Sequence, residues 1–391
     1  MLVKPARARA SALFRATFGV PPVAAASAPG RVNLIGEHTD YNGGPVLPIA
    51  LAQRTVVAAG PGEPGVLEAV SERDGRVWRH LYKEGRAADW PAYVAGVVAE
   101  MQSAGLLAWD AGVRVAVASD VPVGAGLSSS AALTVGATRA LLGLARGRLT
   151  PRQIAGVAYR AEHNYVGVRC GVMDQTIAAL GKPGHALLIE SASLETKQIP
   201  FHGRLLLVDT GVRHDLAVSA FNQRRAECEA AVARLQLDLP EVMWLATWPM
   251  SWLGRLRRAL PQPLRNRALH VVGETARTRF AAQLLARGRL QRFGELLYES
   301  HESCRRLYEC SAPELDTVVA AAKRAGAWGA RLTGAGWGGA VLVLTGKGNR
   351  EKGKGEAAVV ASIRRAFLKA YGRDPAISVV RTGGGARAER V

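Results

Sequence analysis

The chain has 391 residues, of which 48% are hydrophobic and 21% are charged, a length and composition that suit a globular protein of two domains. It contains no run of about eighteen apolar residues, so we expect no membrane-spanning helix and no membrane partner. The formal net charge of +19 would attract anions such as nucleotide phosphates. The arginines are scattered and accompany no nucleic-acid-binding motif, which argues against a nucleic-acid partner.

The chain begins with a helical pattern. Residues 1–36 carry five basic residues and no acidic one, which faintly resembles a targeting peptide. They lack a continuous apolar core, and Ser11–Gly19 has the spacing of a short amphipathic helix that ends at a glycine, so we expect this segment to belong to the fold. The four cysteines have neither C-x-x-C nor zinc-ligand spacing, which predicts reduced thiols in a cytoplasmic enzyme.

A dense polar cluster follows this helix. Arg31, Glu37, His38 and Asp40 fall within ten residues, between glycines that allow tight turns. Carboxylates accept hydrogen bonds from hydroxyl groups, an imidazole can donate or accept, and an arginine can neutralise negative charge. The segment therefore suits a small polyhydroxylated ligand. The alternative is a polar loop of solvated charges, which two glycine-rich segments further along the chain make less attractive.

Strand-like and helical runs alternate along the rest of the chain and predict an α+β fold without a regular βαβ rhythm. A domain boundary near residues 200–204 would give domains 1–203 and 204–391. Arginine-rich helices are also expected at 253–267 and 284–292. The predicted strands are 113–119, 185–190, 205–208, 340–344 and 377–380, and the other predicted helices are 131–145, 151–166, 218–235, 269–287 and 313–325.

Two glycine-rich turns stand next to predicted strands. Gly124–Leu133 joins a strand to a helix, and its serines open that helix, whose free N–H groups would attract phosphate. No Gly-Lys-Ser/Thr follows, so it is not a Walker A loop. Arg331–Ala340 enters the strand at 340–344. Taken alone, the first is equally an ordinary helix cap, and the second an ordinary tight turn.

Together with Gly171–Gln175, these motifs resemble the GHMP sugar and mevalonate kinases, and within them the galactokinase family. The resemblance extends over nearly the whole chain and includes Phe14–Pro22, Gly30–Gly44, Ser300–Ser303 and Pro313–Asp316. It implies a two-domain GHMP kinase fold, with an N-terminal domain like domain 2 of ribosomal protein S5 and a ferredoxin-like α/β C-terminal domain. The active site would lie in the cleft between them.

The resemblance also implies a reaction and a set of site residues. The reaction is transfer of the γ-phosphoryl group of ATP to the C1 hydroxyl of α-galactose, by a cytoplasmic monomer. Asp174 would orient or deprotonate this hydroxyl beside Arg31, and Mg²⁺ would be held by Ser130 and Glu162. The sugar contacts would be Glu37, His38, Thr39, Asp40, Gly171, Asp174 and Phe221. The ATP contacts would be Ser71, Gly124, Ala125, Gly126, Leu127, Ser128, Ser129 and Ser130.

Phe221 departs from the family pattern. It stands where the family has a tyrosine three residues before an Arg-Arg pair, so one hydroxyl is missing from the expected pocket. This leaves open a kinase for another sugar, such as arabinose or N-acetylgalactosamine. A second alternative is a catalytically inactive galactose sensor. Sensors of that type have a shortened serine loop, whereas Ser128–Ala132 and Asp174 are intact here.

Overall fold

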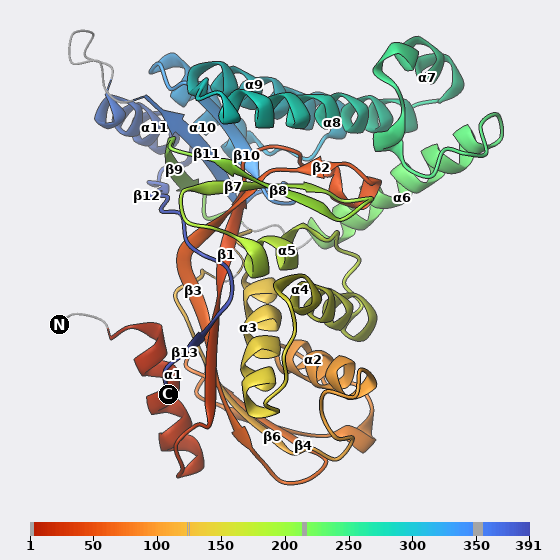
Figure 1. Cartoon of the computed structure of the whole chain (residues 1–391). Coiled ribbons are helices and arrows are strands. Elements are labelled where there is room, and N and C mark those ends of the chain that lie inside the picture. The colour runs from red at the N-terminus through yellow and green to blue at the C-terminus, as the bar shows by residue number, and fades with distance from the viewer. Residues whose placement is uncertain (1–3, 123, 125, 213–216, 347–354) are drawn as a thin grey trace.

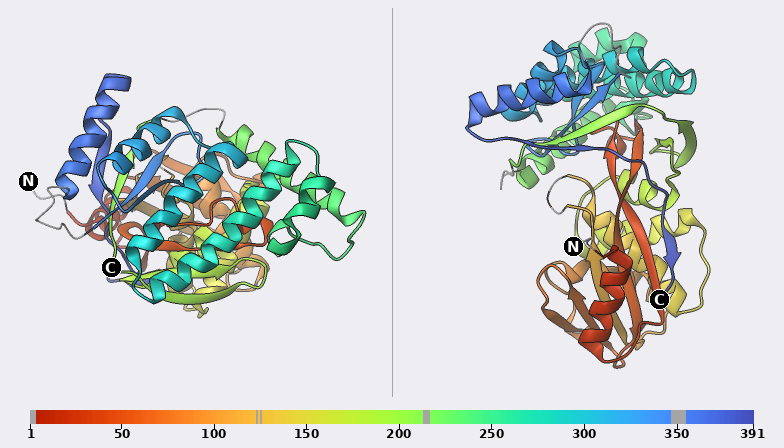
Figure 2. Two further views of the ribbon diagram at one scale, coloured as in Figure 1. Left: turned by 90° about the horizontal axis from the view of Figure 1, so that it is seen from above. Right: turned by 90° about the vertical axis from the view of Figure 1, so that its left-hand side faces the viewer.

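The computed structural model describes residues 4–122, 124, 126–212, 217–346 and 355–391. Two lobes are stacked along the long axis of the molecule, each built on its own β-sheet (Figures 1 and 2). In the described part of the chain, no helix is both long enough and apolar enough to cross a bilayer.

The first lobe is a six-stranded sheet with helices on both faces. Its strand order is β13-β1-β3-β6-β4-β5, antiparallel except for the β4–β6 pair. Alternate residues of a strand face opposite ways, so Val57 and Ala59 pack under α2–α5 while Val56 and Ala58 pack on α1. The strands are β1 (Ala24–Asn33), β3 (Pro48–Pro61), β4 (Val66–Ser71), β5 (Val77–Leu81), β6 (Val113–Ser119) and β13 (Arg387–Glu389). The helices are α1 (Ala6–Phe18), η2 (Tyr82–Glu84), α2 (Pro91–Ser103), α3 (Ser129–Leu144), α4 (Pro151–Arg160), η3 (Ala161–Val166) and α5 (Met173–Leu180), and the short helix η1 (Asp40–Asn42) lies in the loop after β1.

The second lobe is a four-stranded antiparallel sheet in the order β10-β11-β9-β12, covered by helices. Leu206 and Val208 of β9 face the helical core. Leu205 and Leu207 face the other way, in a core shared with Val32 at the end of β1, so the lobes are joined by apolar packing. The strands are β9 (Arg204–Asp209), β10 (Gly329–Thr333), β11 (Ala340–Thr345) and β12 (Ala376–Val379). The helices are α6 (Ala217–Gln236), η4 (Leu245–Thr247), η5 (Met250–Trp252), α7 (Leu253–Ala259), α8 (Leu264–Ala286), α9 (Leu290–Ser303), η6 (Cys304–Tyr308), α10 (Pro313–Arg324) and α11 (Glu356–Tyr371).

A small third sheet lies between the lobes. It consists of β2 (Pro45–Val46), β7 (His185–Glu190) and β8 (Glu195–Pro200), all antiparallel. Because β2 follows the polar cluster of the sequence directly, this pairing fixes the far end of that loop.

The α+β prediction is confirmed, and the strands at 113–119 and 185–190 have the predicted bounds. Two predicted helices are wrong. The helix at 253–267 ends at Ala259, and α8 begins only at Leu264, because Pro261 and Pro263 lie between them. The helix at 284–292 is the end of α8 and the start of α9, separated at Gly288, whose φ of +68° ends the first helix.

The second sheet starts at Arg204, where the sequence placed the domain boundary. The last strand, however, returns to the first lobe, where Arg387–Glu389 pairs with Ser27–Ala25 of β1. A single division at residue 203 would leave this strand apart from its sheet, so the two-domain division stays a prediction.

Candidate active site

The end of β1 brings Arg31 to the junction of the lobes. The strand register shifts between Pro29 and Arg31, and such irregularities redirect a side chain. The backbone N–H of Arg31 donates to the Leu127 carbonyl over 3.0 Å. A Cβ on Gly30 would lie only 2.8 Å from the same oxygen, so the close approach requires a glycine. β1 is thus held against the glycine-serine loop.

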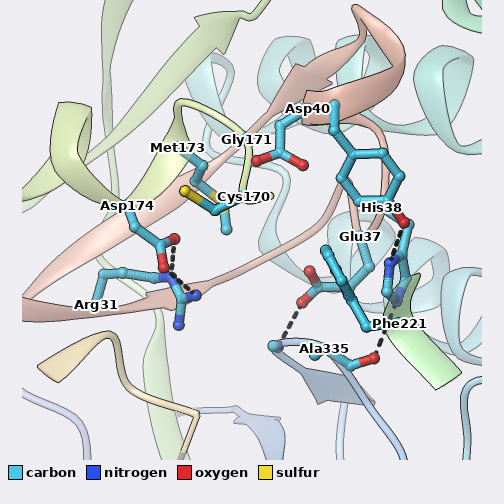
Figure 3. Close-up of a pocket in the computed structure, with 12 residues that line it drawn as sticks. Arg31, Glu37, His38, Asp40, Cys170, Gly171, Met173, Asp174, Phe221 and Ala335 are labelled. Atoms are coloured by element: carbon cyan, nitrogen blue, oxygen red, sulfur yellow. Dashed lines mark hydrogen bonds and ion pairs between the residues drawn. The ribbon is translucent and has the colours of Figure 1, made fainter. Parts of the chain in front are cut away.

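Arg31 and Asp174 form a bidentate ion pair. Asp174 lies in the first turn of α5, and its two oxygens accept from Arg31 Nε over 2.7 Å and Nη2 over 2.8 Å (Figure 3). The third guanidinium nitrogen donates to the Gly126 carbonyl, and the Ser128 hydroxyl donates to the carboxylate. Bidentate pairs fix both partners in one plane, so the carboxylate has a defined orientation next to a positive charge.

This ion pair forms one wall of a polar cavity of about 160 Å³. Side chains from β1, the following loop, the segment before α5, and α6 converge on it (Figure 3). The cavity lies between the lobes, and its lining consists of Arg31, Glu37, His38, Asp40, Tyr41, Cys170, Gly171, Met173, Asp174, Phe221, Gly334 and Ala335.

Glu37 is a buried carboxylate that contacts both lobes. Its Oε1 accepts from the Gly334 backbone N–H over 2.9 Å and from Arg331 Nη1 over 3.4 Å, and its Oε2 accepts from Asn33 Nδ2 over 3.0 Å. Burial raises the pKa of Glu37, although Arg331 and Asn33 act in the opposite direction. Each carboxylate oxygen can accept two hydrogen bonds, so Glu37 can still accept from a ligand hydroxyl.

His38 is neutral and has both ring nitrogens engaged. Burial lowers its pKa to about 3, with a smaller contribution from His270. Nε2 lies 3.0 Å from the Ala335 carbonyl, which can only accept, so Nε2 carries the proton. Nδ1 then accepts from the Tyr41 hydroxyl over 2.7 Å. His38 lines the small cavity, and the Phe221 ring lies 5.9 Å from its ring. Its contact with a sugar stays a prediction.

Asp40 and Gly171 are packed against each other. A Cβ on Gly171 would lie 1.9 Å from Asp40 Oδ2, so any larger residue would displace this carboxylate. Burial raises the pKa of Asp40 to about 6, and the Asp174 carboxylate adds to the shift. At neutral pH Asp40 is therefore mostly ionised and can accept hydrogen bonds from a ligand.

This packing allows a direct test. In the Gly171→Ala variant, the added methyl group is expected to displace Asp40 and raise the KM for the sugar at least tenfold, with a smaller effect on the KM for ATP. Gly156→Ala is the matched control, since a Cβ there meets its nearest neighbour at 3.5 Å within α4. Steady-state kinetics with each substrate varied in turn would measure both constants. Equal sugar KM values in the two variants would contradict the assignment.

A second, larger cavity of about 810 Å³ begins at the N-terminus of α3. Ser71, Ser129 and Ser130, which are predicted ATP contacts, line it, and Trp90 and Tyr93 add aromatic surfaces that no motif indicated. The remaining lining residues are Thr55, Glu72, Arg73, Asp74, Asp89, Val117, Ser119, Val121 and Leu133. Gly124 and Gly126 have φ values of +74° and +72°, and Ala125 lies outside the described residues.

The sequence model of the galactokinase galactose-binding signature matches residues 12–61, and the models of the GHMP kinase N-terminal and C-terminal domains match residues 92–182 and 281–370. Galactokinase from Chloroflexus aurantiacus is 44% identical over 343 residues, which are 85% of this chain and 86% of the relative. Galactokinase from Homo sapiens is 41% identical over 352 residues, which are 86% of this chain and 87% of the relative.

The chain belongs to the galactokinase family. Its structure is similar to the crystal structure of Lactococcus lactis galactokinase complexed with galactose, with a TM-score of 0.89 at 30% identity over 96% of this chain and 98% of that chain. A mevalonate kinase structure shares the fold, with a TM-score of 0.63 at 18% identity. The GHMP kinase fold predicted from the motifs is confirmed, and this galactokinase-family chain is an ATP-dependent sugar kinase.

Two residues predicted as contacts of this galactokinase-family chain do not line the cavities, and their contacts stay predictions. Thr39 does not line the small cavity, because its side chain is fully buried and its hydroxyl donates to the carbonyls of Gly36 and Pro45. This hydroxyl closes the loop. Leu127 does not line the large cavity, because its side chain packs in the core that joins the lobes. The hydroxyl of Ser128, also predicted to contact ATP, donates to Asp174.

Glu162, a predicted metal ligand, is a buried carboxylate. The side chain is buried in η3, and Oε1 accepts from Thr134 Oγ1 over 2.8 Å and Gln175 Nε2 over 2.9 Å. Burial raises its pKa, and the hydrogen bond of Ser130 opposes this. Within the described ranges, Glu162 forms no ion pair, and no group of three or more His, Cys, Asp and Glu residues could bind a metal. Any metal held here would need further ligands from a nucleotide.

Proposed function

We propose that this chain transfers the γ-phosphoryl group of ATP to the C1 hydroxyl of α-D-galactose, giving α-D-galactose 1-phosphate and ADP. The observation that carries the proposal is the Arg31–Asp174 ion pair. It forms a wall of the small polar cavity, and it is bonded to Gly126 and Ser128 of the loop that leads to the large cavity. Galactose is the sugar bound in the Lactococcus lactis relative.

In the proposed reaction, Asp174 orients the C1 hydroxyl and accepts its proton as the O1–Pγ bond forms. The bond between Pγ and the β–γ bridging oxygen breaks, and ADP leaves with that oxygen. Phosphoryl transfer proceeds through a loose transition state, which needs accurate positioning more than a strong base. Arg31 has its guanidinium beside Asp174 and would stabilise the negative charge on the transferred group.

The sugar would be held by the carboxylates of Glu37 and Asp40, which accept hydrogen bonds from its hydroxyl groups. The triphosphate would lie at the N-terminus of α3, where Ser129 and Ser130 present the free N–H groups of the first turn. The aromatic side chains of Trp90 and Tyr93, which also line the large cavity, would contact the base.

Mg²⁺ is part of this proposal, with Ser130 and Glu162 as its protein ligands. One buried carboxylate without an ion-pair partner in the described chain, next to a hydroxyl, suits a cation that takes its other ligands from phosphates and water. The metal would neutralise phosphate charge as the group is transferred. A monomeric state and a cytoplasmic location are also proposed, the latter on the ground that all four cysteines are free.

The role of Glu162 can be tested by Glu162→Gln, which keeps the size of the side chain and removes its charge. We expect the concentration of Mg²⁺ needed for half-maximal activity to rise about tenfold, while the KM for galactose changes less than twofold. Titration of MgCl₂ at fixed ATP would measure this. The exposed residue Glu195 supplies the control variant Glu195→Gln. An unchanged Mg²⁺ requirement in Glu162→Gln would remove Glu162 from the metal site.

The proposed function itself is tested by assaying the purified protein with ATP against galactose, arabinose, N-acetylgalactosamine, glucose and mevalonate, with ADP release as the readout. Galactose is expected to have the highest kcat/KM. Phe221 favours a second candidate, a kinase for another sugar, because it adds an apolar wall to the cavity. A higher kcat/KM for arabinose or N-acetylgalactosamine would establish that candidate. Activity with none of the sugars would refute the proposal.

A further inference from the structure

α8 packs against the loop from Gly36 to Gly44, which carries Glu37, His38 and Asp40. The contacts with the helix are close. A Cβ on Gly44 would lie 2.9 Å from the Thr275 hydroxyl, and a Cβ on Gly36 would lie 3.1 Å from the Thr278 hydroxyl and 2.7 Å from the Pro45 carbonyl. Both threonines are on α8, which belongs to the second lobe. One face of this helix thus serves as the surface against which the loop is shaped.

Glu274, on the same helix, is a fully buried carboxylate that bonds to the loop backbone. Its Oε1 accepts from the N–H of Gly36 over 3.0 Å and lies 3.4 Å from that of Glu37. The Ser300 hydroxyl donates to the same oxygen over 2.6 Å, while Arg277 Nε donates to Oε2 over 2.9 Å. The two oxygens have separate partners: Oε1 binds the backbone N–H groups of the loop, and Oε2 forms the ion pair with Arg277 within the helix.

His270, one turn earlier on α8, binds the backbone carbonyl of Glu37. Burial lowers its pKa to about 4, so it is neutral, and Nε2 donates to the Glu37 carbonyl over 3.1 Å. Nδ1 accepts from the Ser303 hydroxyl over 2.9 Å. The backbone N–H and the backbone carbonyl of Glu37 are therefore both bound by α8. The backbone of Glu37 is thus held by α8, while its side chain, bonded to Gly334, Arg331 and Asn33, lines the cavity (Figure 3).

We propose that Glu274 is a positioning residue for sugar recognition, which fixes the backbone at Gly36–Glu37 so that the Glu37 carboxylate meets the sugar. This inference rests on the proposed function. Glu274 touches neither cavity, and it acts through Glu37 alone. Burial by itself would raise the pKa of Glu274, but Arg277, Arg331 and His270 hold it at about 2, so the carboxylate is charged at every working pH. A charged acceptor binds backbone N–H groups about twice as strongly as a neutral one.

The test compares Glu274→Met with Arg277→Met. The first variant removes the loop contacts together with the helix ion pair, and the second removes only the ion pair. We expect Glu274→Met to raise the KM for galactose tenfold or more while the KM for ATP stays within twofold. Arg277→Met is expected to leave both constants within twofold. Equal increases in the two variants would overturn the proposal, because the ion pair would then explain the effect.

A double-mutant cycle with Glu37→Gln separates positioning from general destabilisation. If Glu274 acts through Glu37, adding Glu274→Met to Glu37→Gln should raise the galactose KM by much less than it does in the wild-type background. Full multiplication of the two effects would overturn the proposal. Should Glu274→Met fail to fold, Glu274→Gln is used in both comparisons. It is expected to raise the galactose KM at least threefold with the ATP KM unchanged, and no increase would equally overturn the proposal.

The failure of this inference can be distinguished from failure of the proposed function. If the wild-type protein does not phosphorylate galactose, the proposed function falls. If it does, and the Glu274 variants keep a wild-type KM for galactose, only the positioning role falls.

Discussion

The Asp174→Ala variant is expected to lower kcat by about 10³-fold or more at saturating galactose and ATP. Removal of a group that accepts a proton in the transition state typically costs a factor of about 10² to 10⁴, and alanine also leaves Arg31 without the partner that fixes its orientation. Binding should survive, because Glu37 and Asp40 remain in the small cavity and the serines remain in the large one. ADP release measures kcat, and calorimetric titration with galactose and with ATP measures the two dissociation constants.

Asp174→Asn distinguishes the two roles of this carboxylate. Asparagine keeps an oxygen that can orient the C1 hydroxyl, but it cannot accept the proton. A loss as large as that of alanine would indicate that proton acceptance dominates, and a loss below tenfold would indicate orientation. Asp110→Ala, at an exposed site in the first lobe, is the control for expression and folding. An Asp174→Ala enzyme with more than a tenth of the wild-type kcat would refute the catalytic role.

The two residues that we propose for phosphoryl transfer could be found from the sequence because they lie in short, continuous motifs. Arg31 and Asp174 each belong to a segment whose composition is unusual on its own, and the fold brings the two segments together over 143 residues. The strand at 113–119 was equally accessible, since its β-branched and small apolar residues suit a strand that is packed on both faces.

The contacts that hold Glu37 in place could not be predicted from the sequence in the same way. Arg331 meets Glu37 from 294 residues away, and nothing in the local pattern of either residue indicates the other. Glu274 lies in a long helix with arginines nearby, where a glutamate normally faces solvent. Its burial follows only from the packing of α8 on the loop, which is a property of the assembled lobes.

The differences between the predictions and the structure have equally local causes. Thr39 stands inside the signature, yet a tight loop must satisfy its own carbonyl groups, and the Thr39 hydroxyl does so. The arginine-rich helices were extended across Pro261, Pro263 and Gly288 because polar residues at helical spacing carry no information about which face is buried. In those segments the helix-breaking residues decided the structure.

Substitution of Arg31 is the second change for which we expect a large loss of kcat. Two substitutions separate the charge of this side chain from its geometry. Arg31→Met is expected to lower kcat about 10³-fold, since arginines that stabilise a transferred phosphoryl group contribute factors of this order. Arg31→Lys keeps the charge but cannot bond both Asp174 oxygens and the Gly126 carbonyl together, as the guanidinium does. We therefore expect it to lie between the wild type and Arg31→Met, with a loss of about 10- to 100-fold.

The measurement is kcat at saturating galactose and ATP for the two variants and the wild type, with thermal unfolding as the check on folding. Arg31 is buried, so both variants should unfold at a lower temperature, and kcat is compared well below that transition. If lysine and methionine reduce kcat equally, the planar fork that holds Asp174 is the essential property and the charge is not. If both variants retain more than a tenth of the wild-type kcat, Arg31 takes no part in the transfer. The loop from Gly126 to Ser130 would then have to stabilise the transferred phosphoryl group in place of the Arg31–Asp174 pair.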